Sequence, residues 1–516
     1  MATFMKGGPT MGRVMIILSL AMLSVGSNVF GAPRGELVVS EGAENTTIEP
    51  HRCYNGPELN FAQTVCDKLL HRDHKGKLVY QLATSSKQID DVTLELKLRK
   101  GVLFQNGDPF TAEDVKFSVE RYIDPKTKAN FAFHYKGIKE VKIMDDYTVR
   151  IITREPDPLM INRLALALYI VPKKYITSKG DDYFSENPLG TGAFKFVKWL
   201  RGDRIIVEAN EKYWDGPPGV ERIIFKPIPE DATRIAELIS GNSHIISNVP
   251  PFLVSQVKAN RGLNIQSIPS GRIMYCYLNT VAEGPLKDKR VRQALNYAID
   301  KTSIVNQVLK GYGHVMGGVL VPYQFGYDET LRPYPYDPDR AKKLLAEAGY
   351  AKGLKLNVNT SSGRYLLDKE VSQAIAGMLN RIGIETDFRV QEWGNYVRIL
   401  TGKELKDIGF IGWKNSIFDA EGTFPPLISK DMEACKKDQF SYYINGEVVG
   451  MLDLARRLHD SERRKEIYRK VQRIIYDEAP FIFLYQQVDN YGVSSKVRGF
   501  EAKSDEFIDL NKVTVD

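Results

Sequence analysis

The chain has 516 residues, of which 43% are apolar and 26% are charged, a balance typical of soluble globular proteins. Its formal net charge is +7, and the charges are interspersed along the sequence, which argues against a nucleic-acid-binding protein, because such proteins gather basic residues on one face. A chain of this length is expected to form about three domains or lobes around sizeable cores.

The N-terminal segment has the pattern of a secretory signal peptide. Lys6 and Arg13 precede an apolar run over 14–25, and small residues follow in 28–33. The run is shorter than the roughly 20 residues that span a bilayer. We therefore predict a cleaved signal peptide over 1–32 and a periplasmic protein without stable membrane insertion or a lipid-anchor cysteine. A buried core helix is the alternative interpretation.

The first half of the mature chain alternates strand and helix patterns. Residues 37–42 predict an opening strand, and 93–104 alternate apolar and polar residues as a half-buried strand does. Thr111 then caps a predicted helix. Further on, 193–200 and 205–209 predict a hairpin, with Gly202 and Asp203 in its tight turn.

The second half repeats this alternation. We predict a strand over 274–280 and a helix over 290–299. Residues 354–390 read as strand, helix and strand, which predicts a parallel pair with a right-handed crossover. A long amphipathic helix from 461 precedes the apolar strand 481–487. The fold class is therefore α/β.

The cysteines are Cys53, Cys66, Cys276 and Cys435. An exported protein can form disulfides, and nearness in sequence favours a Cys53–Cys66 bridge, with Cys276–Cys435 as the second candidate. Free thiols are the alternative, because Cys66 falls on the apolar stripe of a helical pattern and packing alone would explain it.

No catalytic signature is present. The sequence contains no G-x-S-x-G, Walker A or H-E-x-x-H motif, and the glycine-rich 190–194 leads into a strand rather than a helix. His71 and His74 form the only tight histidine pair, which is more often a surface feature than a metal site. We therefore predict no enzyme, no cofactor and no metal. Trp393 and Trp413 follow apolar strands, where α/β proteins bind ligands, although packing in the core is the plain alternative.

Several segments, in this order, resemble the extracytoplasmic solute-binding proteins of the peptide/nickel/oligopeptide class (family 5), which serve ABC importers. The resemblance rests on 96–121, 187–218, 277–313, 334–350 and the Trp413 loop. It implies a two-lobed periplasmic binding protein (type II, cluster C) with an extra subdomain inserted in lobe one. The implied boundaries are lobe one over 33–75, 192–270 and 487–516, the inserted subdomain over 76–191, and lobe two over 271–486.

The resemblance also implies site residues. The ligand-binding positions that it places on this sequence are Trp413, Trp393, Asn415, Ser416, Asp419, Tyr485 and Tyr54. Peptide binders of the family carry an aspartate three residues past the tryptophan, which pairs with the peptide amino terminus, and Ser416 stands there in this chain. Either Asp419 reaches the amine, or the ligand is an uncharged, blocked or non-peptide solute. Tyr213 and Trp214 are expected to pack as scaffold.

The function that the resemblance implies is that of the periplasmic substrate-binding component of an ABC importer. It would take peptides or peptide-like solutes as a monomer and deliver them to membrane permease subunits. The alternatives are the same fold binding an opine, an oligosaccharide or a nickel chelate, and an exported hydrolase.

Overall fold

The structure is a computed structural model that describes residues 33–438 and 440–516. The signal peptide predicted over 1–32 lies outside the described residues. Helices and strands alternate through the described chain, which confirms the α/β class. Among the described helices, none combines the length and apolarity needed to cross a bilayer.

One sheet of 11 strands forms the centre of the fold. Its strands, in spatial order, are β15 (Ile384–Gln391), β14 (Leu354–Ser361), β16 (Ile408–Lys414), β12 (Leu263–Leu278), β17 (Phe481–Ser494), β11 (Ile245–Ile246), β1 (Glu36–Glu41), β10 (Arg222–Pro227), β9 (Arg204–Ala209) and β8 (Phe194–Leu200), with β13 (Gly313–Val315) paired to β17. The predicted parallel pair is confirmed, because β14 runs parallel to β15 with α11 (Asp368–Arg381) between them in sequence.

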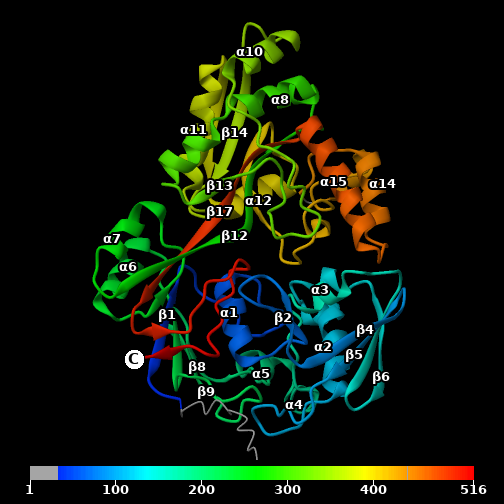
Figure 1. Cartoon of the computed structure of the whole chain (residues 1–516), viewed down its shortest axis with the longest axis vertical. Helices are drawn as coiled ribbons and strands as arrows, with labels where there is room; N and C mark the ends of the chain where they lie inside the picture. Colours follow the sequence, from blue (N-terminus) through cyan, green and yellow to red (C-terminus); the bar gives the residue numbers. More distant parts are fainter. Residues whose placement is uncertain (1–32, 439) are drawn as a thin grey trace, which may run out of the picture. The chain divides into compact units, whose positions relative to one another are not determined.

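The long strands β12 and β17 join the two ends of this sheet (Figure 1). They pair antiparallel along most of their length, and the register breaks between Pro269 and Ile273. On one side of the break β12 also pairs with β16, and on the other side β17 pairs with β11. The two strands therefore connect otherwise separate parts of the sheet through a short irregular stretch.

A second sheet of four strands lies outside the first. Its order is β4 (Ala83–Asp90), β5 (Thr93–Leu98), β7 (Thr148–Thr153) and β6 (Ile138–Asp145), and α2 (Ala112–Ile123) packs beside it. Thr111 is the N-cap of α2, as predicted, and forms a capping box with Asp114. Between the sheets lies the short hairpin of β2 (Leu70–Arg72) and β3 (Leu78–Tyr80).

Three large hydrophobic clusters organise the described residues. The cluster that we call the large core joins β12, β16 and β17 to α8 (Lys289–Ala298) and α11, and includes Ile273, Leu295, Ile375, Phe410 and Phe483. The N-terminal core includes Leu37, Phe61, Val207, Ile417 and Phe507. The insert core includes Leu96, Val115, Val119 and Ile151. The lobe boundaries expected from the sequence remain a prediction, to which these separate cores lend support.

The predicted hairpin and the aromatic pair after it serve as scaffold. β8 and β9 pair antiparallel, and Gly202 in their turn has a φ of +76°, which glycine adopts without strain. Past the hairpin, the Tyr213 hydroxyl donates to Asp67 Oδ1 at 3.0 Å and Trp214 Nε1 donates to Asp67 Oδ2 at 2.8 Å. Tyr213 is buried and Trp214 is half-buried, which confirms that both pack as scaffold.

The four cysteines are free, buried thiols, so neither bridge expected from the sequence is formed. Cys53 Sγ donates to the Glu49 carbonyl at 3.3 Å, whereas Cys66 Sγ faces the Leu189 carbonyl at 3.9 Å. Both belong to the N-terminal core, while Cys276 belongs to the large core. Burial raises the pKa of the Cys53 and Cys66 thiols well above the usual value. Packing, the alternative drawn from the apolar stripe, accounts for these residues.

Candidate ligand-binding site

Three strand ends meet at one edge of the large sheet. β14 runs parallel to both β15 and β16, so the loops that follow Ser361, Gln391 and Lys414 leave the same edge. These loops carry Arg364, Trp393 and the segment after Trp413. The carboxyl edge of parallel strands is where α/β proteins bind ligands, because the loops there are free to vary above a fixed scaffold.

The loop after β14 is fixed by one buried carboxylate. Asp368 Oδ2 accepts hydrogen bonds from Ser361 Oγ at 2.8 Å, Arg364 N at 3.1 Å and Tyr365 N at 3.2 Å. Its Oδ1 accepts from Gly363 N at 3.1 Å. The backbone that presents Arg364 and Tyr365 is thereby held in a single arrangement before any ligand arrives.

Arg364 lies on an aromatic platform. Its guanidinium carbon is 5.1 Å from the ring centroids of both Tyr365 and Trp393, within the range of a cation–π contact. Trp393 is the first residue of α12 (Trp393–Thr401), and its ring meets Tyr365 edge-on at 5.8 Å. The side chain of Arg364 is exposed, and no ion pair or hydrogen bond to it occurs among the described residues. A stacked, unpaired guanidinium of this kind is suited to a carboxylate.

Trp413 and its neighbours continue this surface. Trp413 is half-buried against the large core, donates from Nε1 to the Gly422 carbonyl at 2.9 Å and meets Phe440 at 5.8 Å. Tyr365 donates from its hydroxyl to the Gly412 carbonyl at 3.2 Å, which joins the Trp393 and Trp413 regions. Ser416 is half-buried. Among the predicted residues, Trp393, Trp413 and Ser416 are therefore placed around one edge.

Asp419 and Asn415, by contrast, are buried and bind other residues of the protein. Asp419 is 1% exposed, its Oδ2 pairs with Arg464 at 2.5 Å and its Oδ1 accepts from Glu421 N at 3.1 Å. Asn415 is buried and holds its own loop. The suggestion that Asp419 reaches a ligand amine is therefore not supported, because both carboxylate oxygens are occupied inside the protein.

The two predicted tyrosines differ in exposure. Tyr485 is 2% exposed on β17, with a hydroxyl that finds no partner among the described residues, so it lies in the core rather than at the edge. Tyr54 is 64% exposed and stacks on Phe131 at 6.0 Å. Burial raises the pKa of Tyr365, although the charges of Arg272 and Arg364 oppose the rise.

A partly buried charge cluster lies where β12 and β17 lose their register. Glu506, in the C-terminal segment, accepts from Arg272 Nη2 at 2.9 and 3.2 Å and from Lys414 Nζ at 3.2 Å. Burial alone would raise the pKa of Glu506, but the charges of Arg272 and Lys414 outweigh it and lower the pKa to about 2. Asp489 is nearby, and burial together with the charge of Glu506 raises its pKa to about 6. Glu506 thus stays ionised and ties the C-terminal segment to the end of β16.

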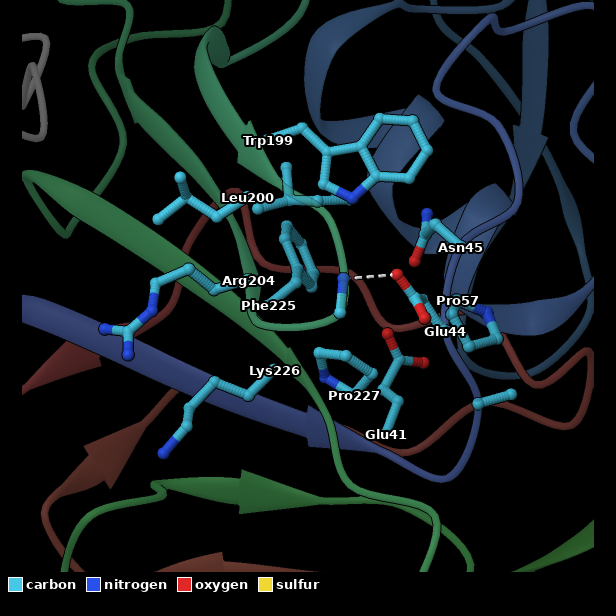
Figure 2. A pocket seen from close by; sticks show the side chains of 13 residues that line it. Glu41, Glu44, Asn45, Pro57, Trp199, Leu200, Arg204, Phe225, Lys226 and Pro227 are labelled. Atoms are coloured by element: carbon cyan, nitrogen blue, oxygen red, sulfur yellow. Dashed lines mark hydrogen bonds between the residues drawn. The ribbon is translucent and has the colours of Figure 1, made fainter.

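A hollow beside the ends of β1 and β10 is a separate feature. Figure 2 shows it lined by Glu41, Trp199, Phe225 and Pro227 among others, with Glu44 accepting a hydrogen bond from the Gly202 amide at 2.5 Å. The space in it is about 10 Å³, which holds about one water molecule. The hollow is therefore too small for a peptide-sized guest.

Metal ligands do not gather in the described part of the chain. Over residues 33–438 and 440–516, no group of three or more His, Cys, Asp or Glu side chains is placed to hold a metal ion. His71 lies on β2, whereas His74 in the following turn pairs with Glu501 at 2.9 Å. The two histidines therefore lie in different surroundings, His71 on a strand and His74 in a surface ion pair.

Comparison with known proteins agrees with this architecture. Residues 77–433 match the family described as bacterial extracellular solute-binding proteins, family 5. The chain belongs to this family.

Relatives of this family-5 protein align along nearly its whole length. The glutathione-binding protein GsiB of Escherichia coli K12 is 28% identical over 492 residues, 94% of this chain and 95% of GsiB. The Helicobacter pylori periplasmic binding protein DppA, solved with the peptide STSA, is 27% identical, with a TM-score of 0.79 over 94% of this chain and 98% of DppA. NikZ of Campylobacter jejuni, solved with Ni(L-His), is 25% identical, with a TM-score of 0.79 over 93% and 98%. The fold is thus that of two-lobed periplasmic binding proteins, and the family binds substrates for ABC importers.

Sequence reasoning missed several charged residues of this family-5 protein. Arg364, Arg272 and Glu506 lie far apart in the chain and follow no local motif. The signal that was available is the position of Arg364 and Tyr365 in the loop after a predicted parallel strand, where α/β proteins bind ligands. No comparable signal marks Arg272 or Glu506, whose pairing depends on the tertiary fold.

Proposed function

We propose that this chain is the extracytoplasmic binding component of an ABC importer for peptides or peptide-like solutes. The observation on which the proposal chiefly rests is the Arg364 guanidinium, preset over Trp393 and Tyr365 at the carboxyl edge of parallel strands and free of any acidic partner among the described residues. A peptide-like solute offers the carboxylate that such a group binds and the flat amide or apolar groups that an aromatic platform accepts.

The acidic residues near the platform favour an anchor at the carboxylate rather than at an amine. Asp419 is occupied by Arg464, and Glu506 is occupied by Arg272 and Lys414. Ser416 offers only a neutral hydroxyl. A solute held mainly by its acidic end, including one whose amine is blocked, therefore suits this edge better than one held by a free amine.

Binding would act through closure of the two lobes. The strands β12 and β17 connect the parts of the sheet through an irregular stretch, the kind of element at which domains hinge. A solute that touches both lobes only when they close stabilises the closed state by its differential affinity for it. We propose that a membrane permease recognises that closed state and that the protein works as a monomer, by binding alone and without catalysis.

The proposal includes the export route. Residues 1–32 would direct secretion to the periplasm and be cleaved, leaving a mature protein without a lipid anchor. The names of the relatives support a small-solute guest, since GsiB is named for glutathione and DppA was solved with a peptide. NikZ, solved with Ni(L-His), keeps a nickel chelate as the second candidate guest.

The test is calorimetric titration of the mature protein with the tripeptide Ala-Ser-Ala, reduced glutathione, Ni(L-His), octopine and maltotriose. We expect binding of a peptide-like probe, and we expect Arg364→Gln to weaken it by about tenfold or more, as the loss of a charge-assisted contact does. Arg389→Gln is the matched control, because Arg389 is an exposed arginine on β15 that is already paired with Asp387. Binding of Ni(L-His), octopine or maltotriose without either peptide-like probe would contradict the peptide assignment.

A further inference from the structure

The loop after β16, which we call the 415–418 loop, crosses between two hydrophobic cores. Phe410 and Ile411 on β16 belong to the large core, and Ala420 returns to it. Between them, Ile417 is 2% exposed and belongs to the N-terminal core. The loop therefore leaves one body of packed side chains, inserts into another and comes back within a few residues.

The large-core side holds this loop firmly. Asn415 Nδ2 donates to the Asp419 carbonyl at 2.6 Å and to Thr423 Oγ1 at 2.9 Å, and Asn415 Oδ1 accepts from Ile417 N at 3.2 Å. The Phe418 carbonyl accepts from Phe325 N at 2.9 Å. We call this loop the peg, because hydrogen bonds on the large-core side fix its shape while Ile417 packs in the other core.

The tip of the peg fits a glycine on the other side. A Cβ on residue 76 would lie 2.9 Å from Phe418 Cε1, so only glycine leaves room for the ring. Arg72 lies with its guanidinium carbon 4.3 Å from the centroid of the same ring and donates to the Ile417 carbonyl at 3.0 Å. Arg72 and Gly76 belong to β2 and the turn that follows it, so the receiving surface, which we call the Gly76 socket, is built by the β2–β3 hairpin.

Phe418 is held in a costly backbone conformation. Its φ is +58°, in the left-handed region that side chains larger than glycine avoid, and its side chain is 6% exposed. Such a conformation persists only where the surrounding contacts impose it. Here those contacts are the Gly76 socket on one side and Tyr323, with ring centroids 5.3 Å apart, on the other.

The peg follows Trp413 in the sequence and contains Ser416, and both are residues of the candidate binding edge. We propose that Phe418, seated in the Gly76 socket, is a specificity-determining residue that closes one end of the solute space, so that short solutes fit and extended ones do not. This inference rests on the proposed function, since it describes the same site. At this end of the site, the two cores touch through Phe418 on one side and Arg72 and Gly76 on the other.

Two substitutions disrupt the fit from opposite sides. Phe418→Ala removes the ring, and Gly76→Asn places a Cβ against it while keeping a residue that tolerates positive φ. Gly101→Asn is the matched control, because Gly101 has the same φ of +77° as Gly76 but has open space where a Cβ would go. Circular dichroism establishes that each variant is folded.

The first readout is the affinity for Ala-Ser-Ala and for the hexapeptide (Ala-Ser)₃, measured by calorimetry. We expect the wild type and Gly101→Asn to prefer the tripeptide by about tenfold or more, and we expect Phe418→Ala and Gly76→Asn to reduce this preference by a similar factor. An unchanged preference in both folded variants would overturn the inference while leaving the proposed function intact.

The second readout needs no solute. In the solute-free protein, the contact of Phe418 with Gly76 is expected to favour the closed lobes in an equilibrium that a solute then shifts further. Small-angle scattering should therefore give Phe418→Ala and Gly76→Asn a larger radius of gyration than the wild type and Gly101→Asn. If no peptide binds the wild type, the peptide assignment fails, and the scattering experiment alone tests whether Phe418 holds the two cores together. Equal radii in all four proteins would then overturn it.

Discussion

Asp67 shows how one buried side chain organises the segment that follows the β8–β9 hairpin. Its carboxylate accepts hydrogen bonds from Tyr213, Trp214, Thr191 and Gln81, residues that come from distant parts of the chain. Burial raises the pKa of Asp67 to about 6, although these hydrogen bonds oppose the rise. The aromatic residues after the β8–β9 hairpin are thus held around a carboxylate, which gives Tyr213 and Trp214 a structural role.

Replacing this carboxylate is expected to destabilise the fold. In Asp67→Asn the amide turns two N–H donors toward groups that themselves donate, so the free energy of unfolding should fall by about 2 kcal/mol at pH 7. The pKa of Asp67 is higher in the folded state than in the unfolded state, so the free energy of unfolding of the wild type should fall as the pH rises from about 4 to about 6. This dependence on pH should be weaker in the variant. Urea denaturation across this pH range measures both effects, with the exposed Asp91→Asn as control. Equal stability of Asp67→Asn and wild type at pH 7 would contradict the assigned role.

At the scale of elements, the sequence predicts local structure better than the pairing of distant strands. The parallel unit 354–390 and the cap at Thr111 are predicted because periodicity and capping are local signals. By contrast, only 274–280 and 481–487 are predicted from strands that run over Leu263–Leu278 and Phe481–Ser494. The missed part of β12 alternates apolar and polar residues only over 263–266, and Pro269 with the polar residues around it interrupts the pattern before the apolar run from Ile273.

The same limit applies to the site. Trp393 and Trp413 are predicted because they follow recognisable strands, and the structure places both at one sheet edge. Arg364 is missed although it stacks on Trp393, because nothing local distinguishes an arginine that stacks from one that is solvated. Asp419 is named as a candidate although it pairs with Arg464, an ion pair that spans 45 residues and has no signature in the sequence.

The loop after β14 is the element on which the candidate site depends most. In Asp368→Asn, one side of the carboxylate becomes an N–H donor that faces the amides of the loop, so Arg364 and Tyr365 lose their fixed position. We expect a loss of stability of about 1–3 kcal/mol and about tenfold weaker binding of the best peptide-like probe. Asp387→Asn on the neighbouring strand β15 is the control, since Asp387 pairs only at the surface with Arg389. Weakened stability with unchanged affinity would show that the loop does not position the ligand.

At the scale of the whole molecule, Glu506 links the C-terminal segment to the strands of the large core. Its neighbour Phe507 belongs to the N-terminal core, whereas Ile273, beside Arg272, belongs to the large core. The ion pairs of Glu506 with Arg272 and Lys414 therefore join two hydrophobic bodies at the point where β12 and β17 are irregular. The backbone of Glu506 has a φ of +64°, which indicates that these contacts hold it against its conformational preference.

Removing this carboxylate should therefore cost more than a surface charge would. Glu506→Gln removes the carboxylate with which the buried Arg272 forms its ion pair, and breaking a buried pair in this way costs about 3 kcal/mol or more. The pKa of Glu506 is lowered from 4.5 to about 2 in the folded state, so its stabilisation is complete above pH 4.5 and is lost as the pH falls toward 2. The difference between wild type and variant should accordingly be largest at pH 7 and shrink steadily below pH 4.5. Scanning calorimetry at pH 7 and at about pH 3 measures it, with Glu501→Gln, an exposed residue of the same segment, as the control. If Glu506→Gln lowers the stability equally at both pH values, Glu506 acts through packing. The claim that its charge joins the two cores would then be wrong.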